Sequence, residues 1–390
     1  MLPGQLTPLL AEGLVRLGTW MPFARAAGEM QYFFHVAVSE ATLRRATEQA
    51  GAVYVAVQEA EAERLQRELP EAPAGVDKQL LSVDGAFVGV VGGAWVEVKT
   101  LTVGEIQAPV LERGKSVVHT THLSYFSRVS EARAFTPQAC VETYRRGVAT
   151  SRVVCAVTDG AEWIQGFVDW HRPDAVRILD FYHAAEHVAA AGRAVHGEDT
   201  PAFHTWFDRQ QHTLKDGDPE QVLTELRALL GTPLDEAARQ TVETSLNYLQ
   251  ARRAMLRYAA FQPAGYPIGS GAGEACHKFV IETRLKGTGM RWARTHINPL
   301  AALRNLVCND RWEEGWAQIA AHLRQRAPRP AAPKPAPSPS PPDTAGAEAG
   351  AATRPLLPPG FKLRPTTPWG DRSHGKGLAR PSAEWPTAKK

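Results

Sequence analysis

The sequence of 390 residues has few cysteines and lacks a long hydrophobic run. Its four cysteines are widely spread without a C-x-x-C pair, which argues against both a disulfide framework and a compact zinc finger. No stretch of about 18 apolar residues exists, and the start lacks the charged and apolar segments of a secretory signal. We therefore expect a cytoplasmic protein without a membrane partner, whose 44% hydrophobic residues can form a sizeable core.

The net charge of +3 is unevenly distributed along the chain. Residues 327–390 hold ten Lys or Arg and four Asp or Glu, which gives +6 and leaves −3 for residues 1–326. This tail is rich in Pro, Ala and Ser with hardly any large apolar residue, so it cannot bury enough surface to offset the entropy of ordering. We predict that residues 327–390 are a disordered basic extension.

Helical periodicity dominates the first 50 residues. Apolar residues recur at helical spacing in "LTPLLAEGLVRLGTW" and "MPFARAAGEMQYFF", and Ser39 is placed to cap a third helix. Residues 1–50 therefore have the outline of a helix-turn-helix with Arg44 and Arg45 exposed as DNA contacts, although a structural helical bundle has the same outline. Residues 51–78 follow as a predicted connector helix.

From residue 79 the pattern changes to strands. Three segments with period-two alternation are followed by a helix, a strand, a second helix and the short strand in "AVRILDFYH". This order predicts an α/β protein with a mixed sheet of the ribonuclease-H-like type. We assign its first part to residues 79–181, an all-helical insertion to 182–262, and its last part to 263–326.

Three acidic residues stand at informative places in this order. Asp84 lies inside the first predicted strand, Asp159 follows a later strand, and Glu274 opens a late helix after a glycine cluster. Converging carboxylates repel one another unless cations hold them, and oxygen ligands suit Mg²⁺ or Mn²⁺, the metals of phosphodiester chemistry. Taken singly, each residue also has a structural explanation, because Asp-Gly forms turns and an acid favours a helix start.

Several segments resemble a known family. "LSVDGAFVGV", "AVTDGAEWI", "ILDFYHAAEHV", "GSGAGEACHKFVIETRLKGTGMRW" and "LRNLVCNDRWEEGW" are similar to the insertion-sequence transposases of the Kra type (ISKra family), over about residues 5–320. The resemblance implies a DDE triad of Asp84, Asp159 and Glu274 that binds Mg²⁺ or Mn²⁺ and cleaves and transfers DNA strands. It also implies binding to terminal inverted repeats and target DNA, as a homodimer or higher synaptic complex.

The resemblance also has a gap. Family members carry an upstream segment with cysteine pairs, and no such segment precedes Leu6, so we expect a chain shortened at its start. A helix-turn-helix DNA-binding relic without catalytic activity is therefore the alternative to an active transposase.

A basic segment after the glycine cluster is the second predicted DNA contact, with a solvated helix face as the alternative. Trp292 is the candidate for base stacking, because basic residues bracket it after the "KGTG" turn, although core packing is the usual role of tryptophan. The predicted DNA contacts in this segment are Lys278, Arg284, Lys286, Arg291, Trp292 and Arg294.

The segment "FYHAAEHV" allows a rival function. His183, Glu186 and His187 match the H-x-x-E-H pattern of inverted zinc peptidases, with Glu274 as a possible third ligand. Such short patterns occur by chance in helices, and a peptidase leaves Asp84 and Asp159 unexplained. In the transposase interpretation, Asp180 and His183 form an auxiliary pair near the active site, although a buried hydrogen-bonding histidine is the ordinary alternative.

Overall fold

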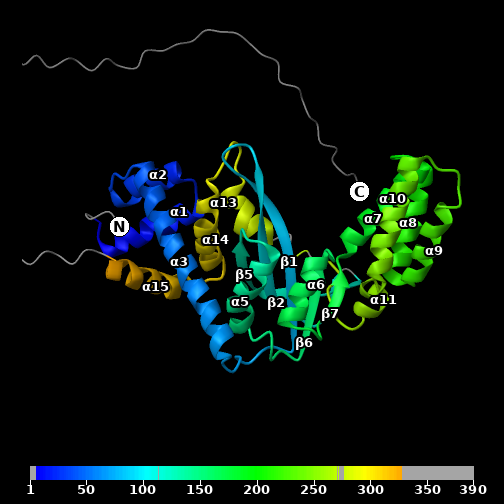
Figure 1. The fold of residues 1–390 in the computed structure, drawn as a ribbon, viewed down its shortest axis with the longest axis horizontal. Helices are drawn as coiled ribbons and strands as arrows, with labels where there is room; N and C mark the ends of the chain where they lie inside the picture. The colour runs from blue at the N-terminus through cyan, green and yellow to red at the C-terminus, as the bar shows by residue number, and fades with distance from the viewer. Residues whose placement is uncertain (1–5, 113, 270, 272–275, 327–390) are drawn as a thin grey trace, which may run out of the picture. The chain divides into compact units, whose positions relative to one another are not determined.

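The computed structural model describes residues 6–112, 114–269, 271 and 276–326 (Figure 1). Two predictions lie outside these ranges: the disordered extension at 327–390 and the position of Glu274. The chain is α/β, as the sequence predicted. Among the helices that the structure describes, none has the length and apolar character needed to cross a membrane.

A mixed five-stranded sheet lies at the centre of the described chain (Figure 1). Its strand order is β5-β2-β1-β6-β7, in which β1 is antiparallel to β2 and parallel to β6, while β7 extends the parallel half. The strands are β1 (Lys78–Gly89), β2 (Trp95–Ile106), β5 (Thr120–Arg128), β6 (Val153–Thr158) and β7 (Val176–Leu179).

The connection between β2 and β5 contains a small hairpin that the sequence did not indicate. β3 (Val110–Glu112) pairs with β4 (Lys115–Val117) as a separate two-stranded sheet. The chain entering this hairpin is hydrogen-bonded to the chain leaving it, because the Gln107 amide donates to the His119 carbonyl at 2.9 Å. The third predicted strand therefore divides into β4 and β5.

One face of the sheet is covered by helices that follow β5 and β6. Leu81 and Val83 of β1 pack there against Phe135 and Phe167, in a core separate from that of the opposite face. The covering helices are α4 (Ala132–Gln138) and α6 (Glu162–His171), while Cys140 and Val141 of the intervening α5 (Cys140–Arg145) pack with Ala62 and Leu65.

A helical region follows β7 and packs on the other face of the parallel half. Leu80, Cys155 and Val157 of the sheet share a core with its helices. Its first residue lies beside the segment that follows the region, because the Phe181 amide donates to the Ile268 carbonyl at 2.9 Å. Its elements are α7 (Phe181–His196), α8 (Pro201–Asp216), α9 (Pro219–Leu229), α10 (Glu236–Ala251), η1 (Arg253–Met255) and α11 (Tyr258–Phe261). We call residues 181–261 the helical insertion.

The N-terminal helices differ from a separate helix-turn-helix and connector. α1 (Pro8–Trp20) and α2 (Phe23–Phe34) precede a single helix, α3 (Glu40–Glu68), which crosses the boundary placed at residue 50. Ser39 caps α3 as predicted, and its hydroxyl accepts from the Thr42 amide at 3.2 Å. Gly51 lies inside this helix, where its missing side chain makes room for the Pro299 backbone.

The last helices pack on the N-terminal ones. Leu14 and Leu43 share a core with Leu300 and Trp312, and the Trp312 indole donates to the Glu12 carboxylate at 2.9 Å. The two ends of the described chain thus form one hydrophobic cluster. These last elements are the π-helix η2 (His277–Glu282), α13 (Thr283–Leu285), α14 (Arg294–Cys308) and α15 (Trp312–Arg326).

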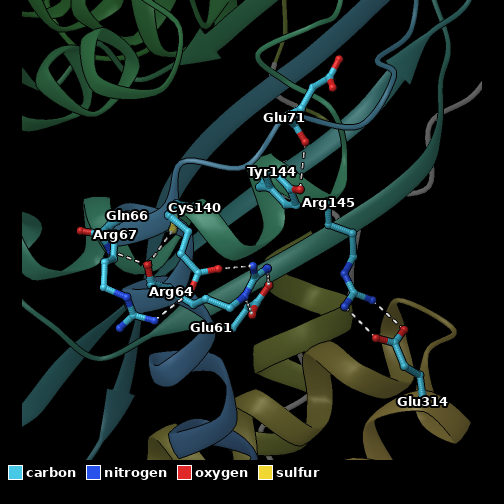
Figure 2. Close-up of polar contacts among 11 residues, drawn as sticks. Glu61, Arg64, Gln66, Arg67, Glu71, Cys140, Tyr144, Arg145 and Glu314 are labelled. Carbon is cyan, nitrogen blue, oxygen red and sulfur yellow. Dashed lines mark hydrogen bonds and ion pairs between the residues drawn. The ribbon is translucent and has the colours of Figure 1, made fainter.

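Polar contacts fix α5 between α15 and the end of α3 (Figure 2). Arg145 makes two hydrogen bonds to Glu314, at 2.6 and 2.7 Å. The neighbouring Tyr144 hydroxyl donates to the Glu71 carbonyl at 3.0 Å, beyond the end of α3. These contacts join segments that are far apart in the sequence.

Candidate functional site

Two predicted metal ligands lie at the same level on neighbouring parallel strands. The register of β1 and β6 pairs Leu81 with Ala156. Asp84 lies three residues beyond Leu81, and Asp159 lies three residues beyond Ala156. Because parallel strands advance together, this register places the two aspartates side by side at one edge of the sheet.

Alternation along the strands also places both aspartates on one face. Asp84 lies an even number of residues from Leu80 of β1, so the two side chains share a face of the sheet. In the same way, Asp159 lies an even number of residues from Cys155 and Val157 of β6. Those three apolar residues belong to the core beneath the helical insertion. Both aspartates therefore face the side of the sheet that the insertion covers.

The Asp84 carboxylate is half-buried and has partners on two sides. One oxygen accepts from the Gly85 amide at 2.7 Å, and the other lies 3.3 Å from Nε2 of His277. Burial alone raises the pKa of this carboxyl, but the His277 contact, the Gly85 hydrogen bond and the nearby His183 together lower it below its usual value. Asp84 is therefore ionised at neutral pH, as a metal ligand must be.

Asp159 belongs to a tight turn after β6. Its carboxylate accepts from the Ala161 amide at 2.9 Å, and Gly160 has the positive φ of 78° that favours glycine. The structural explanation that the Asp-Gly pair forms a turn is thus correct here. It is compatible with a ligand role, because the turn fixes the carboxylate at the strand end.

Asp180 and His183 lie together at the next strand end. Asp180 directly follows β7 and caps α7, where its side chain accepts from the His183 amide at 2.9 Å. Because β6 and β7 pair Thr158 with Leu179, the next residues along the two strands, Asp159 and Asp180, also lie side by side. The predicted auxiliary pair therefore begins beside Asp159, although His183 lies in the first turn of a helix rather than on a free turn.

His277 is a site residue that the sequence did not identify. Its side chain is 8% exposed, and its Nδ1 is buried without a hydrogen-bond partner. It follows Glu274 by one helical turn in the sequence, which is the signal that could have marked it. Glu274 itself lies outside the described residues, but His277 shows that the helix after it contacts Asp84.

Tyr248 also belongs to the site, although it was not predicted. Its hydroxyl donates to the Asp159 carbonyl, and its ring centroid lies 5.9 Å from that of His183. Burial raises the pKa of Tyr248 to about 12, and the charges of Asp159 and Asp180 contribute to the rise. Tyr248 therefore stays protonated and remains a donor at neutral pH.

The H-x-x-E-H residues have a different arrangement from a formed zinc site. His187 stacks on Tyr248 with ring centroids 3.9 Å apart and an interplanar angle of 16°. Glu186 is largely exposed and lies 3.7 Å from His183. Within the described ranges, no three His, Cys, Asp or Glu side chains are grouped closely enough to hold a metal ion. The zinc peptidase interpretation gains no support from this geometry.

Two of the predicted DNA contacts are corrected by the structure. Arg284 is buried, and its guanidinium donates twice to the Gly18 carbonyl, at 3.1 and 3.0 Å, while lying over Phe23. Trp292 is also buried, and its indole donates to the Leu285 carbonyl at 3.0 Å. Both side chains pack against Phe23 and so join the N-terminal helices to the last part of the chain, which explains them by packing without a DNA contact.

The remaining predicted DNA contacts are exposed. Arg44 and Arg291 line one cavity of about 330 Å³ between the N-terminal helices and the segment before α14. Glu40 and Glu48 line the same cavity, so its charge is mixed. The exposed cations are Arg44, Arg45, Lys278, Lys286, Arg291 and Arg294.

No protein-family model matches the chain, and no curated protein is significantly similar to it.

Proposed function

We propose that this chain is a metal-dependent DNA transposase with a ribonuclease-H-like core. The observation that carries the proposal is the alignment of Asp84 and Asp159 on one face of neighbouring parallel strands. The strand order β5-β2-β1-β6-β7 supports it, since β1 lies between its antiparallel and parallel neighbours. The sequence resemblance supplies the third ligand, Glu274, in a segment whose following turn contacts Asp84 through His277.

The donor atoms in this region fit a hard divalent cation. Asp84 and Asp159 offer carboxylate oxygens, the ligands that Mg²⁺ and Mn²⁺ prefer. Two such ions, which Asp84, Asp159 and Glu274 would hold, would supply activation of a water or sugar hydroxyl and stabilisation of the leaving oxygen of a phosphodiester. The protein orients Asp84 through Gly85 and His277, and it orients Asp159 through the turn at Gly160.

The substrate in this proposal is DNA that carries the terminal inverted repeats of a mobile element. Arg44 and Arg45 of α3 contact the inverted repeats, the exposed cations of the last part of the chain contact phosphates, and cleavage occurs at the strand ends that carry Asp84 and Asp159. Synapsis of two ends by a homodimer or larger assembly belongs to the same proposal. The alternative, a non-catalytic DNA-binding relic, differs from it in the chemistry alone.

The decisive experiment measures Mg²⁺- or Mn²⁺-dependent cleavage of duplexes taken from the repeats that flank the coding sequence. Asp84→Asn, Asp159→Asn and Glu274→Gln should each reduce cleavage on the order of 1,000-fold or more, and pairs of changes should not multiply the loss. DNA binding should persist, because each change removes a negative charge near phosphate.

Glu186→Gln is the matched control within the same region, because the Glu186 side chain is largely exposed. It should retain most of the cleavage activity in the transposase, whereas a zinc peptidase would lose the carboxylate that activates its water. Sequence-specific DNA binding by a wild-type protein that cleaves none of these duplexes would favour the relic instead. Activity that survives all three acid substitutions would reject the metal site.

A further inference from the structure

The turn that contains Asp159 is held by the end of helix α10. The Tyr248 hydroxyl donates to the Asp159 carbonyl, and Nε of Arg252 donates to the Gly160 carbonyl at 2.8 Å. Tyr248 and Arg252 are one helical turn apart, so one helix end contacts two consecutive carbonyls. The helical insertion is thus bonded directly to the backbone of a proposed metal ligand.

The Tyr248 side chain is itself fixed by its neighbours. His187 stacks on its ring, and the Arg252 guanidinium carbon lies 3.7 Å from the ring centroid. Nη1 of Arg252 also donates to the Tyr248 carbonyl at 2.9 Å. Because both the hydroxyl and the ring have partners, the donor is held in one orientation before any ligand arrives.

The turn is shaped to admit Arg252. A Cβ atom at Gly160 would lie 2.6 Å from Nε of Arg252 and 2.8 Å from a methyl carbon of Leu179. Gly160 therefore serves two purposes, the positive φ of the turn and the close approach of the guanidinium. Any larger residue would displace either the turn or the arginine.

We propose that Tyr248 and Arg252 are positioning residues that fix the Asp159 turn and so make the helical insertion a determinant of divalent-cation affinity. This inference rests on the proposed function for the identity of the bound ion. Neither side chain contacts the metal in this scheme. They act through the backbone carbonyls, which limit the freedom of the Asp159 carboxylate before it binds.

The experiment titrates the full chain with Mn²⁺ alone and follows the free ion by electron paramagnetic resonance. Tyr248→Phe keeps the stacked ring and removes only the hydroxyl, while Arg252→Met keeps the aliphatic stem and removes the donors. Each variant should bind Mn²⁺ about 10-fold more weakly than the wild type. Tyr144→Phe is the matched control, since it deletes a hydroxyl bonded to the Glu71 carbonyl and should leave Mn²⁺ affinity unchanged.

Wild-type Mn²⁺ affinity in both variants, with only a lower melting temperature, would overturn the inference and reduce the two residues to structural supports. Mn²⁺ binding that Asp159→Asn does not weaken would instead contradict the proposed function, because Asp159 would then not be a metal ligand. Amide hydrogen exchange at Gly160 and Ala161 then decides the positioning role without a metal. Faster exchange in Tyr248→Phe supports it, and unchanged exchange refutes it.

Discussion

At the scale of single residues, the strand-end turn depends on one glycine. Gly160→Ala would combine an unfavourable positive φ with a close contact to Arg252. We expect the free energy of unfolding to fall by about 1–3 kcal/mol, measured by urea denaturation. Gly166→Ala in α6 is the control, because no atom lies within 4 Å of the place its new methyl group would take, and alanine favours a helix by about 1 kcal/mol. Equal stability of the two variants would show that the turn tolerates a side chain.

His171 gives the protein a pH-dependent stability. Burial lowers the pKa of His171 to about 3, although its hydrogen bond to the Thr136 carbonyl opposes the shift. The unfolded chain binds this proton at a higher pH than the folded chain, so stability is present at neutral pH and lost as the pH falls from about 6.5 towards 3. At pH 4.5 this single group should cost about 2–3 kcal/mol.

Chemical denaturation at pH 7 and pH 4.5 measures this effect. His171→Asn should reduce the difference between the free energies of unfolding at pH 7 and pH 4.5. His204→Gln, at an exposed position of α8, should leave that difference unchanged. The prediction fails if both variants retain the wild-type pH dependence.

At the scale of elements, α3 and α14 approach unusually closely. A Cβ atom at Gly51 would lie 2.3 Å from the carbonyl oxygen of Pro299, which is backbone and cannot turn aside. Gly51→Ala should therefore separate the helices and lower the free energy of unfolding by about 1–3 kcal/mol. Gly28→Ala in α2 has open space and should be neutral or slightly stabilising. Thermal unfolding of both variants checks this, and a stabilised Gly51→Ala protein would refute the tight contact.

Element by element, local patterns predicted more than long-range contacts. Period-two alternation marked β1, β2 and the segment that divides into β4 and β5, and Ser39 marked the start of α3, because both signals lie within a few residues. The close approach of α14 to Gly51 could not be inferred, since Pro299 lies far away in the sequence. Likewise, the sequence presents Arg284 as one more cation, and only the folded chain brings it to the Gly18 carbonyl, 266 residues away.

In the candidate site too, local sequence signals identified some residues and long-range packing determined the others. Asp84 and Asp159 could be inferred from their places on strands, and the register later aligned them. His277 and Tyr248 could not, because a histidine in a late helix and a tyrosine in a distant one carry no local signal of their partners. Their roles follow from packing between segments that the periodicity describes separately.

At the scale of the whole molecule, the surface offers a test of DNA binding. Arg44 and Arg45 are exposed near the start of α3, so changing both to Ala should weaken binding to inverted-repeat duplex more than to random duplex. If both contact phosphates, the slope of log affinity against log salt should also fall by about 1.8. Arg67→Ala, at the other end of α3, is the control. Unchanged affinity in the double variant would leave α3 a structural helix.

The shared cluster of first and last helices has a consequence for the order of events during synthesis. Leu14 and Leu43 find Leu300 and Trp312 only after nearly the whole chain has left the ribosome. The contact of Asp84 with His277 must wait as well, because the helical insertion is made between them. Nascent chains shorter than about 300 residues should therefore expose the apolar side of α1–α3, and we expect chaperones to bind them before Asp84 and His277 come together.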